Sequence, residues 1–296
     1  MPTIGFIGLG NMGAPMAANL VKAGERVSGF DLLPASRQAS AGAGVEIAGS
    51  ARSSVEDADV VITMLPAGEQ VVSVWTDVLP AAKKGALFID CSTIDVARAR
   101  AAHALAAVRG IAALDAPVSG GVGGAKAATL TFMVGGSADA FARGRPLLER
   151  MGKRVVHCGE AGNGQVAKIC NNMILGVSMI AVSEAFVLGE KLGLSHQALF
   201  DVASSSSGQC WSLTSYCPVP GPVPASPANN SYKPGFAAAL MLKDLKLARE
   251  AAASVKAKTT LGAQAAAIYE QFAEIGRSGS DFSAIITLVR EQSEKA

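Results

Sequence analysis

Residues 162–173, which read GNGQVAKICNNM, hold the pair of side chains best suited to chemistry. Lys168 and Asn172 are four residues apart, so a helix places them on one face, one turn from each other. The strongly apolar stretch that follows predicts a buried helix. An amine there can exchange a proton with a substrate hydroxyl once burial or a nearby positive charge lowers its pKa from about 10.4. On spacing alone, a lysine at a helix end with Asn172 capping or packing beside it is the simpler interpretation.

A second candidate site lies at residues 8–13, where GLGNMG stands between the apolar stretch TIGFI and a helical one. This pattern predicts a dinucleotide site, with glycines for the tight turn, for close approach to a pyrophosphate and for helix–strand packing. The expected cofactor contacts are Gly8, Gly10, Asn11, Met12 and Gly13. Asp31, 21 residues after Gly10, is placed to accept hydrogen bonds from a ribose and to repel a 2′-phosphate, which favours NAD over NADP. Arg37 favours NADP, although a solvated helix charge explains it as well.

Further cofactor contacts are expected where later strands end, because the carboxyl ends of strands face the ligand crevice in such sheets. Leu65 and Pro66 follow one strand, Thr93 follows the next, and Gln70 belongs to the helix between them. Taken alone, each is more simply an ordinary loop or helix residue.

Residues 115–124, DAPVSGGVGG, suggest a backbone nest whose N–H groups hold a substrate carboxylate, with the Ser119 hydroxyl adding to it. A flexible glycine-rich turn is equally consistent. Lys243 and Asp244 form a charged pair in the apolar segment LMLKDLKLA, where an ion pair between helices is the simpler interpretation. Trp211 and Tyr216 flank a proline-rich loop, where they either cover the crevice or anchor packing.

The order of elements predicts an α/β domain with a doubly wound parallel sheet, followed by an all-α domain. Expected strands are 3–7, 27–30, 60–64, 86–89, 111–114, 130–134 and 154–158, separated by helices at 12–22, 70–79, 95–107 and 138–151. Later helices are expected at 165–192, 198–204, 237–257, 260–274 and 282–293. We therefore expect a Rossmann-like domain over residues 1–162 and a helical domain over 163–296, with the substrate at their junction. Prolines exclude helix over 217–235, which predicts a lid, an interaction arm or a disordered segment.

Composition narrows the function classes. Half of the 296 residues are hydrophobic, and the net charge of +2 with both signs scattered argues against a nucleic-acid partner. Polar residues interrupt the longest apolar run, so we expect a buried helix and no membrane span. Five cysteines without a CxxC pair predict neither a metal site nor disulfides and fit a reducing compartment. With the first strand expected near Thr3, no signal peptide fits; we expect the cytoplasm, or the mitochondrial matrix if a presequence was removed.

Ordered motifs along essentially the whole chain resemble the β-hydroxyacid dehydrogenase family. FIGLGNMGAPMAANL is similar to the family's N-terminal signature, DAPVSGGVGGAKAATLTFMVGG to its substrate-binding motif and GNGQVAKICNN to its catalytic motif. LMLKDLKLA and GQCWSLTSYCPVPG are similar to the hydroxyisobutyrate branch in particular. One position departs from the pattern, because Ala128 stands where the family usually has Gly. If this position needs φ > 0, the turn carries strain of about 1 kcal/mol.

The resemblance implies a role for each candidate residue. Lys168 is then the catalytic acid/base, with Asn172 assisting it. Lys243 contacts the nicotinamide end of the cofactor as well as the substrate. The full set of implied substrate contacts is Ser119, Gly120, Gly121, Trp211, Lys243 and Asp244. The helical domain is expected to build a homodimer or homotetramer.

The implied activity is reversible NAD-dependent oxidation of a β-hydroxyacid, with (S)-3-hydroxyisobutyrate from valine breakdown as the expected substrate and methylmalonate semialdehyde as the product. Because neutral Lys168 takes the hydroxyl proton as hydride leaves, oxidation is expected to be faster at alkaline pH. L-Serine, a glycerate-type acid and tartronate semialdehyde are alternative substrates for the same chemistry. A nucleotide-binding protein without turnover is an alternative of another kind, and the presence of both Lys168 and Asn172 argues against it. An imine reductase of similar architecture is a further alternative, and Lys168 argues against that.

Overall fold

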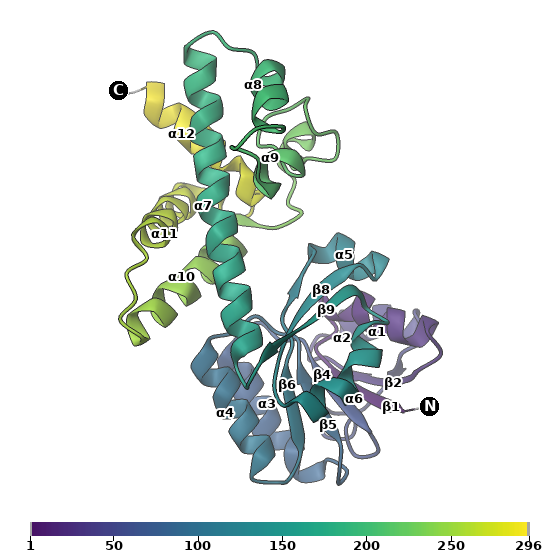
Figure 1. Ribbon diagram of the computed structural model, residues 1–296. Coiled ribbons are helices and arrows are strands. Elements are labelled where there is room, and N and C mark those ends of the chain that lie inside the picture. Colours follow the sequence, from purple (N-terminus) through teal and green to yellow (C-terminus); the bar gives the residue numbers. More distant parts are fainter. Residues whose placement is uncertain (1, 295–296) are drawn as a thin grey trace. The chain divides into compact units, whose positions relative to one another are not determined.

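The computed structural model describes residues 2–294, which divide into two compact units, one ending at Lys168 and the other beginning at Ile169. The first unit is a layered α/β domain of the Rossmann type, and the second is all-helical, as the order of elements predicts. The division falls within one long helix, α7 (Asn163–Lys191), which Figure 1 shows as a continuous helix. The turn that carries Lys168 belongs to the α/β unit.

The α/β unit is built on one sheet, with strands in the order β3-β2-β1-β4-β5-β6-β8-β7 and with β9 paired to β8. The strands are β1 (Thr3–Ile7), β2 (Arg26–Phe30), β3 (Glu46–Ile47), β4 (Val60–Thr63), β5 (Leu87–Asp90), β6 (Ala112–Asp115), β7 (Val118–Ser119), β8 (Leu130–Gly135) and β9 (Gly152–Gly159). Strands β1 to β6 are parallel and follow the 3-2-1-4-5-6 order of dinucleotide-binding sheets.

The expected parallel arrangement holds through β6, and the sheet becomes mixed beyond it. β8 runs antiparallel to β6 and β7. A parallel crossover needs roughly a dozen residues or more, and only the short segment containing α5 (Gly121–Ala127) joins β7 to β8. The chain therefore turns back on itself at this edge.

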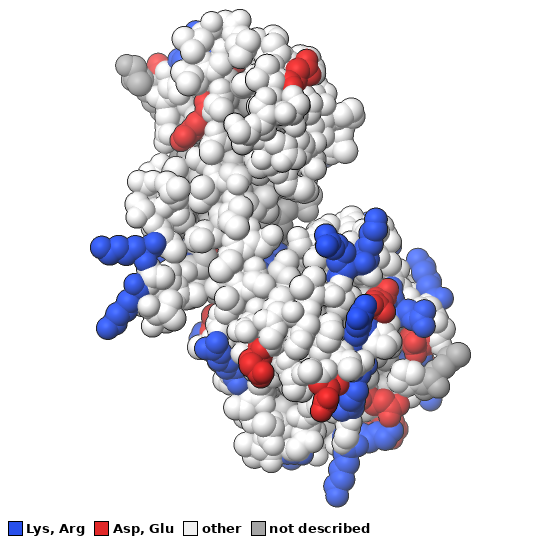
Figure 2. Space-filling model, viewed as in Figure 1, with Lys and Arg blue, Asp and Glu red and all other residues white. Residues whose placement is uncertain are grey.

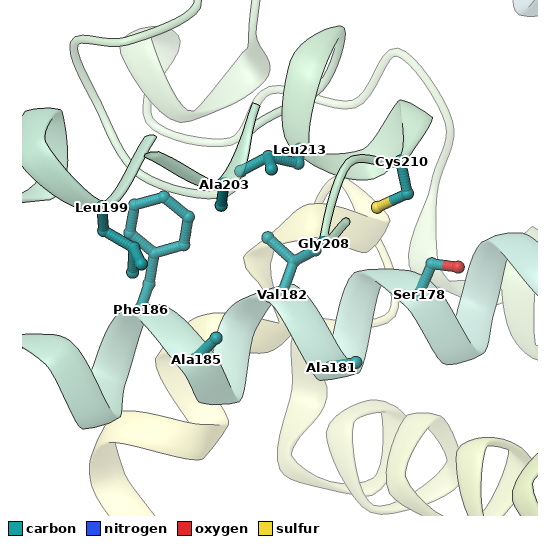
Figure 3. Close-up of a pocket in the computed structure, with 10 residues that line it drawn as sticks. All are labelled: Ser178, Ala181, Val182, Ala185, Phe186, Leu199, Ala203, Gly208, Cys210 and Leu213. Carbon is teal, nitrogen blue, oxygen red and sulfur yellow. The ribbon is translucent and has the colours of Figure 1, made fainter. Parts of the chain in front are cut away.

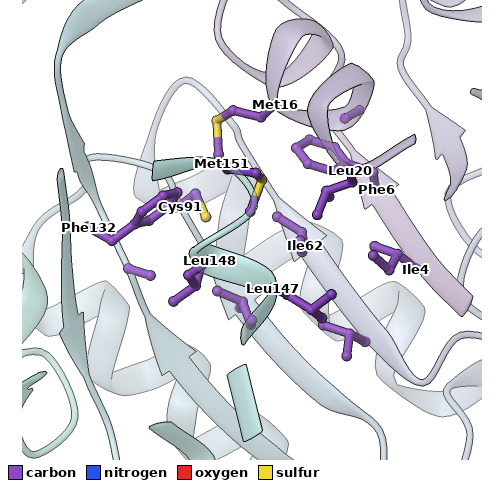
Figure 4. Close-up of a cluster of buried hydrophobic side chains, with 14 of the residues drawn as sticks. Ile4, Phe6, Met16, Leu20, Ile62, Cys91, Phe132, Leu147, Leu148 and Met151 are labelled. Carbon is purple, nitrogen blue, oxygen red and sulfur yellow. The ribbon is translucent and has the colours of Figure 1, made fainter. Parts of the chain in front are cut away.

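Helices cover both faces of the sheet, and an apolar core lies under each layer. These helices are α1 (Gly13–Lys22), α2 (Pro34–Ala41), α3 (Gly68–Val78), α4 (Val96–Ala107), α5 and α6 (Ala138–Leu148). Successive strand residues point to opposite faces, so Ile62 joins one core and Val61 the other. Figure 4 shows the first core, where Phe6 and Ile62 of the sheet meet Met16 and Leu20 of α1.

The structure also forms elements where no regular structure was expected, namely α2, β3, β7 and α5 in the α/β unit and α9 (Trp211–Thr214) in the helical unit. α5 reads GVGGAKA, and glycine disfavours helix by about 1 kcal/mol relative to alanine. Tertiary packing stabilises it nonetheless: Ala125 is fully buried, and its carbonyl oxygen accepts a hydrogen bond of 2.6 Å from the buried Asn19 side chain of α1. The substrate-motif segment is therefore tied directly to the helix that follows the GxGxxG turn.

The helical unit contains the rest of α7 together with α8 (His196–Ala203), α9 (Trp211–Thr214), α10 (Ala238–Ser254), α11 (Thr260–Phe272) and α12 (Ile285–Glu294). The proline-rich loop 217–235 is ordered and packed within this unit. It contains a short 3-10 helix (Pro227–Asn230), which corrects the expectation that its prolines exclude helix, because a proline is tolerated in the first turn. Ser226 donates a hydrogen bond of 2.6 Å to the carbonyl oxygen of Cys217, and the Tyr232 hydroxyl donates one of 2.8 Å to that of Pro218. Val219 is fully buried, so the loop forms part of this unit's core.

α7 is long and apolar enough to cross a membrane by length and composition alone, and 44% of its most apolar window is buried in the structure. A core helix passes the same test, so this property is weak evidence for a membrane span.

Candidate functional site

Each of the three glycines of the GxGxxG motif is required for a different structural reason. Gly8 has φ +97°, and a Cβ there would lie 2.2 Å from the Met64 carbonyl oxygen. A Cβ on Gly13 would lie 1.8 Å from the carbonyl oxygen of Gly8. Gly10 is different, because a Cβ there would meet no heavy atom of the described chain within 4 Å. The missing side chain of Gly10 therefore leaves open space beside the start of α1, where a pyrophosphate must approach the backbone.

The N-terminus of α1 suits an anion. Within the described part of the chain, no side chain caps this helix, and its first turn contains no acidic residue. Its N–H groups and the positive end of its dipole are thus available to phosphate oxygens. Together with the space beside Gly10, this edge of the sheet fits a dinucleotide.

Asp31 is held rigidly beside the glycine turn. Its Oδ2 accepts the backbone N–H of Leu9 at 2.7 Å, and its Oδ1 accepts that of Leu33 at 2.8 Å. Arg37 is engaged nearby, since it donates to the carbonyl oxygen of Asp31 at 2.6 Å and its guanidinium lies 5.7 Å from the centre of the Phe30 ring. The carboxylate is therefore fixed at the end of β2, and Arg37 stabilises the same loop by donating to its backbone carbonyls.

A buried carboxylate, Asp90, links the two later segments expected to contact the cofactor. Its Oδ1 accepts the Ser92 hydroxyl at 2.6 Å and the Thr63 hydroxyl at 2.8 Å. The Ser92 Oγ in turn accepts the backbone N–H of Leu65 at 2.8 Å. Burial raises the pKa of Asp90 to about 6, against the lowering effect of these hydroxyl hydrogen bonds. Asp90 and Ser92 thus fix the segments of Leu65 and Thr93 to each other.

Asp115, the last residue of β6, holds the start of α7. Its Oδ1 accepts the backbone N–H of Gly162 at 2.8 Å, and its Oδ2 accepts that of Gln165 at 3.0 Å. The His103 ring nitrogen Nε2 lies 3.0 Å from the same carboxylate. Asp115 is buried and caps α7 from a distant strand, which sets the position of the first helical turn.

Lys168 and Asn172 are both buried, with 7% and 2% of their surface exposed. In the helical unit, the Asn172 amide donates a hydrogen bond of 2.5 Å to Oδ2 of Asp244, which is itself buried on α10. Asn172 Oδ1 accepts a bond of 2.9 Å from Asn171. The structure thus brings Asn172 and Asp244 together, a pairing that the sequence did not predict.

The glycines of the substrate motif form an ordered turn. Ser119 ends β7. Gly120, the residue before α5, has φ +132°, and Gly121, the first residue of α5, has φ +59°. Such backbone angles are open to glycine and costly for other residues. Ala128 ends α5 with φ +55° and ψ +37°. The condition set for strain at Ala128 is therefore met.

Trp211 opens α9 and is half exposed, and its ring stacks on Tyr216 with centroids 4.9 Å apart. The Tyr216 hydroxyl donates a hydrogen bond of 2.9 Å to Asp281, which is fully buried. Tyr216 is therefore a packing anchor of the helical unit, and it presents Trp211 at the surface of that unit. Gln70 is exposed in the first turn of α3.

Sequence reasoning missed Asp90, Ser92, Asp115 and Gln165. A usable signal was present for the two carboxylates, because each one is the last residue of an otherwise apolar strand. No such signal marks Ser92 or Gln165, whose importance depends on backbone groups that are distant in sequence.

An apolar cavity of about 270 Å³ lies in the helical unit between α7, α8 and α9 (Figure 3). Its lining includes Val182, Phe186, Leu199 and Leu213, and none of the candidate catalytic residues contributes to it. No group of three or more His, Cys, Asp or Glu within residues 2–294 is arranged to hold a metal ion. On the face shown in Figure 2, Lys and Arg alternate with Asp and Glu over the α/β unit, and few charges lie on the helical unit.

Comparison with known proteins gives full-length matches. A family model described as the NAD binding domain of 6-phosphogluconate dehydrogenase matches residues 3–159, and one described as NAD-binding of NADP-dependent 3-hydroxyisobutyrate dehydrogenase matches residues 162–289. The chain is 57% identical to a probable 3-hydroxyisobutyrate dehydrogenase of Mycobacterium tuberculosis, over 99% of its own length and 100% of the relative's. It is 47% identical to an NAD-dependent L-serine dehydrogenase of Pseudomonas aeruginosa, over 96% and 97% of the two lengths.

A solved structure described as Mycobacterium tuberculosis 3-hydroxyisobutyrate dehydrogenase with L-serine superposes on the chain with a TM-score of 0.96 at 57% identity. The match covers 98% of this chain and 99% of the other.

Proposed function

The chain belongs to the 3-hydroxyisobutyrate dehydrogenase group of the β-hydroxyacid dehydrogenase family, and we propose that it oxidises (S)-3-hydroxyisobutyrate to methylmalonate semialdehyde with NAD, a step of valine breakdown. Membership makes it an oxidoreductase that acts on CH–OH groups with a nicotinamide dinucleotide. The observation that carries the substrate proposal is the 57% identity along the full length to a probable 3-hydroxyisobutyrate dehydrogenase.

Lys168 is the proposed acid/base. The bound nicotinamide supplies the hydride acceptor. The neutral amine of Lys168 takes the proton of the substrate hydroxyl while the hydride leaves the carbon that bears this hydroxyl. Because the two transfers occur together, little negative charge builds up on the alcohol oxygen. Two observations support this role. Lys168 is buried, and Asp115 fixes the first turn of the helix that carries it. Oxidation therefore accelerates as pH rises, since only the unprotonated amine accepts the proton.

The remaining candidates bind and orient the substrate. The turn formed by Ser119, Gly120 and Gly121 is the proposed carboxylate site, with backbone N–H groups and one hydroxyl as donors. Asn172 is the proposed second ligand of the reacting hydroxyl, and the Asp244 carboxylate orients its amide. Lys243 and Trp211 are kept as proposed contacts of the cofactor and of the substrate, respectively.

NAD is the proposed cofactor in preference to NADP. The Asp31 carboxylate retains lone pairs beyond the two backbone hydrogen bonds that fix it, and these can accept ribose hydroxyls. A 2′-phosphate would meet a fixed negative charge there. Arg37, the residue that favoured NADP in the sequence, donates to backbone carbonyls of its own loop.

L-Serine is the second candidate substrate, because one relative is an NAD-dependent L-serine dehydrogenase and the similar solved structure is described with L-serine. The deciding experiment follows NADH formation at saturating NAD with (S)-3-hydroxyisobutyrate, L-serine and D-glycerate. A kcat/KM at least tenfold higher for hydroxyisobutyrate, about 1.4 kcal/mol at the barrier, supports the proposal. A preference for serine or glycerate assigns the same chemistry to the other acid.

A homodimer or homotetramer is the proposed assembly. α7 and the residue after it carry exposed apolar side chains at Ile174, Leu188 and Leu192, which a partner subunit would cover. Light scattering on the purified protein tests this proposal. The variant Leu188→Glu is expected to weaken the assembly, and a wild-type monomer at micromolar concentration would contradict it.

The cytoplasm is the proposed location, with the mitochondrial matrix as the alternative if a presequence was removed. All five cysteines are free thiols, which suits a reducing compartment. Fractionation of the source cells, followed by the dehydrogenase assay, tests this proposal.

A further inference from the structure

Gln165 lies in the first turn of α7, three residues before Lys168, and is fully buried. Its side-chain amide is used at both ends. Oε1 accepts the backbone N–H of Ile94 at 3.1 Å, and Nε2 donates to the backbone carbonyl of Ser92 at 2.8 Å. The two hydrogen bonds therefore hold the backbone on both sides of Thr93.

The helical turn that carries Gln165 is fixed by the strands on which it packs. The backbone N–H of Gln165 donates a hydrogen bond to the Asp115 carboxylate. A Cβ on the neighbouring Gly164 would lie 2.4 Å from the Met133 carbonyl oxygen and 2.5 Å from that of Asp115. This turn of α7 therefore packs directly against the backbones of β6 and β8.

The segment that Gln165 holds is fixed on its other side as well. The Ser92 hydroxyl links Asp90 to the backbone N–H of Leu65. A continuous set of hydrogen bonds thus runs from Leu65 through Ser92 to Gln165, within the α/β unit. Leu65 and Thr93 stand at the strand ends that face the nicotinamide half of the cofactor in this fold.

We propose that Gln165 is a positioning residue that keeps the turn carrying Lys168 in register with the segment carrying Thr93. This inference rests on the proposed role of Lys168. The site needs one donor and one acceptor on a single rigid group, because Ser92 offers a carbonyl and Ile94 an N–H. Glutamine provides both, whereas glutamate provides only the acceptor when ionised. Since displacement of a reacting group by about 1 Å can cost 10²-fold in rate, loss of this link lowers the rate of the chemical step.

The test uses Gln165→Glu and Gln165→Met in the full-length enzyme. Gln165→Glu preserves the size of the side chain and its bond to Ile94, so it carries the test if Gln165→Met fails to fold. Ser54→Ala is the control, because it also removes a side-chain hydrogen bond of a buried residue in the α/β unit, the part-buried one of 2.7 Å to the Ala51 carbonyl. Readouts are kcat, the dissociation constant of NAD, the melting temperature, and the isotope effect with substrate deuterated at the alcohol carbon.

We expect both Gln165 variants to lose at least tenfold in kcat, to keep the NAD dissociation constant within threefold, and to show a larger isotope effect than the wild type. Ser54→Ala is expected to keep the wild-type kcat at a comparable melting temperature. A kcat within threefold of wild type in Gln165→Met, or in Gln165→Glu at alkaline pH where the carboxyl is ionised and has no donor, overturns the inference, as does a loss of kcat that only follows loss of folded protein. Lys168→Ala, measured alongside, separates the two claims: normal turnover in that variant overturns the proposed function itself.

Discussion

The amide of Asn172 and the carboxylate of Asp244, 72 residues apart in sequence, form a buried hydrogen bond of 2.5 Å in the helical unit. This hydrogen bond gives the buried Asn172 amide a carboxylate acceptor. It holds the Asn172 side chain in one orientation, with the amide nitrogen toward Asp244. Because Asn172 follows Lys168 by one helical turn, its orientation matters for any group bound by both.

Asp244→Ala is expected to cost about 1–3 kcal/mol of stability, since it removes the acceptor of a buried donor. Turnover should also fall by about tenfold as Asn172 loses its fixed orientation. Asp244→Asn retains an acceptor oxygen and is the control, with a smaller loss expected in both quantities. Urea unfolding and steady-state rates provide the measurements. Wild-type stability and turnover in Asp244→Ala would show that the pair has neither role.

Ala128→Gly is expected to stabilise the protein. The left-handed conformation at φ +55° costs alanine about 1–2 kcal/mol, and glycine loses part of this gain through the entropy of its unfolded chain. A net gain of about 0.5–1 kcal/mol should appear in urea unfolding, with kcat unchanged. Ala127→Gly, one residue earlier and inside α5, is the matched control and should destabilise by about the same amount. Destabilisation by Ala128→Gly would contradict the strain argument.

Asp90 should make stability depend on pH in an unusual direction for a carboxylate. Its folded-state pKa of about 6 exceeds the unfolded value of about 3.9, so the native state holds the proton more tightly. The stabilisation is fully present below about pH 4 and is lost as pH rises through 6, by up to about 3 kcal/mol.

The variant Asp90→Asn removes this dependence while keeping an acceptor for Ser92 and Thr63. The unfolding free energy of the variant minus that of the wild type should therefore increase by up to about 3 kcal/mol from pH 4 to pH 7. Denaturant unfolding of both proteins across this range measures the difference. A difference that stays constant with pH would show that Asp90 does not titrate there.

Asp31→Ser is expected to lower kcat/KM for NAD at least tenfold and to raise the NADP to NAD ratio, because it removes both the ribose acceptor and the charge that repels a 2′-phosphate. Arg37→Ala is the companion variant. It should leave the preference for NAD in place, since Arg37 bonds to backbone carbonyls. An unchanged ratio in Asp31→Ser would remove Asp31 from cofactor selection.

Local patterns predicted most of the fold. Apolar runs predicted both ends of β1 exactly, and the ends of the other predicted strands differ from the observed ones by at most two residues. The short helix α5 was not predicted, because its glycines oppose helix, and tertiary contacts such as the burial of Ala125 and the hydrogen bond from Asn19 stabilise it. The antiparallel return of β8 was missed for a related reason, since pairing direction depends on the length of that connection.

The candidate site was predicted unevenly. The glycine turn and Asp31 follow from spacing within one βαβ unit, so sequence suffices to find them. Asp115, Gln165 and Asp244 act through partners 50 to 73 residues away, and no local pattern reveals such partners. Their roles emerge only once the sheet and α7 are assembled.

Lys168→Ala provides the most direct test of the account. Hydride transfer from (S)-3-hydroxyisobutyrate to NAD should be measured by stopped-flow absorbance at 340 nm from pH 6 to pH 10, beside the wild type and with NAD binding measured separately. The account predicts a wild-type rate that rises with pH, and a variant slower by orders of magnitude that still binds NAD normally. A variant with near wild-type hydride transfer, or a wild-type rate that is flat over this range with chemistry rate-limiting, would contradict the assignment of Lys168 as the acid/base.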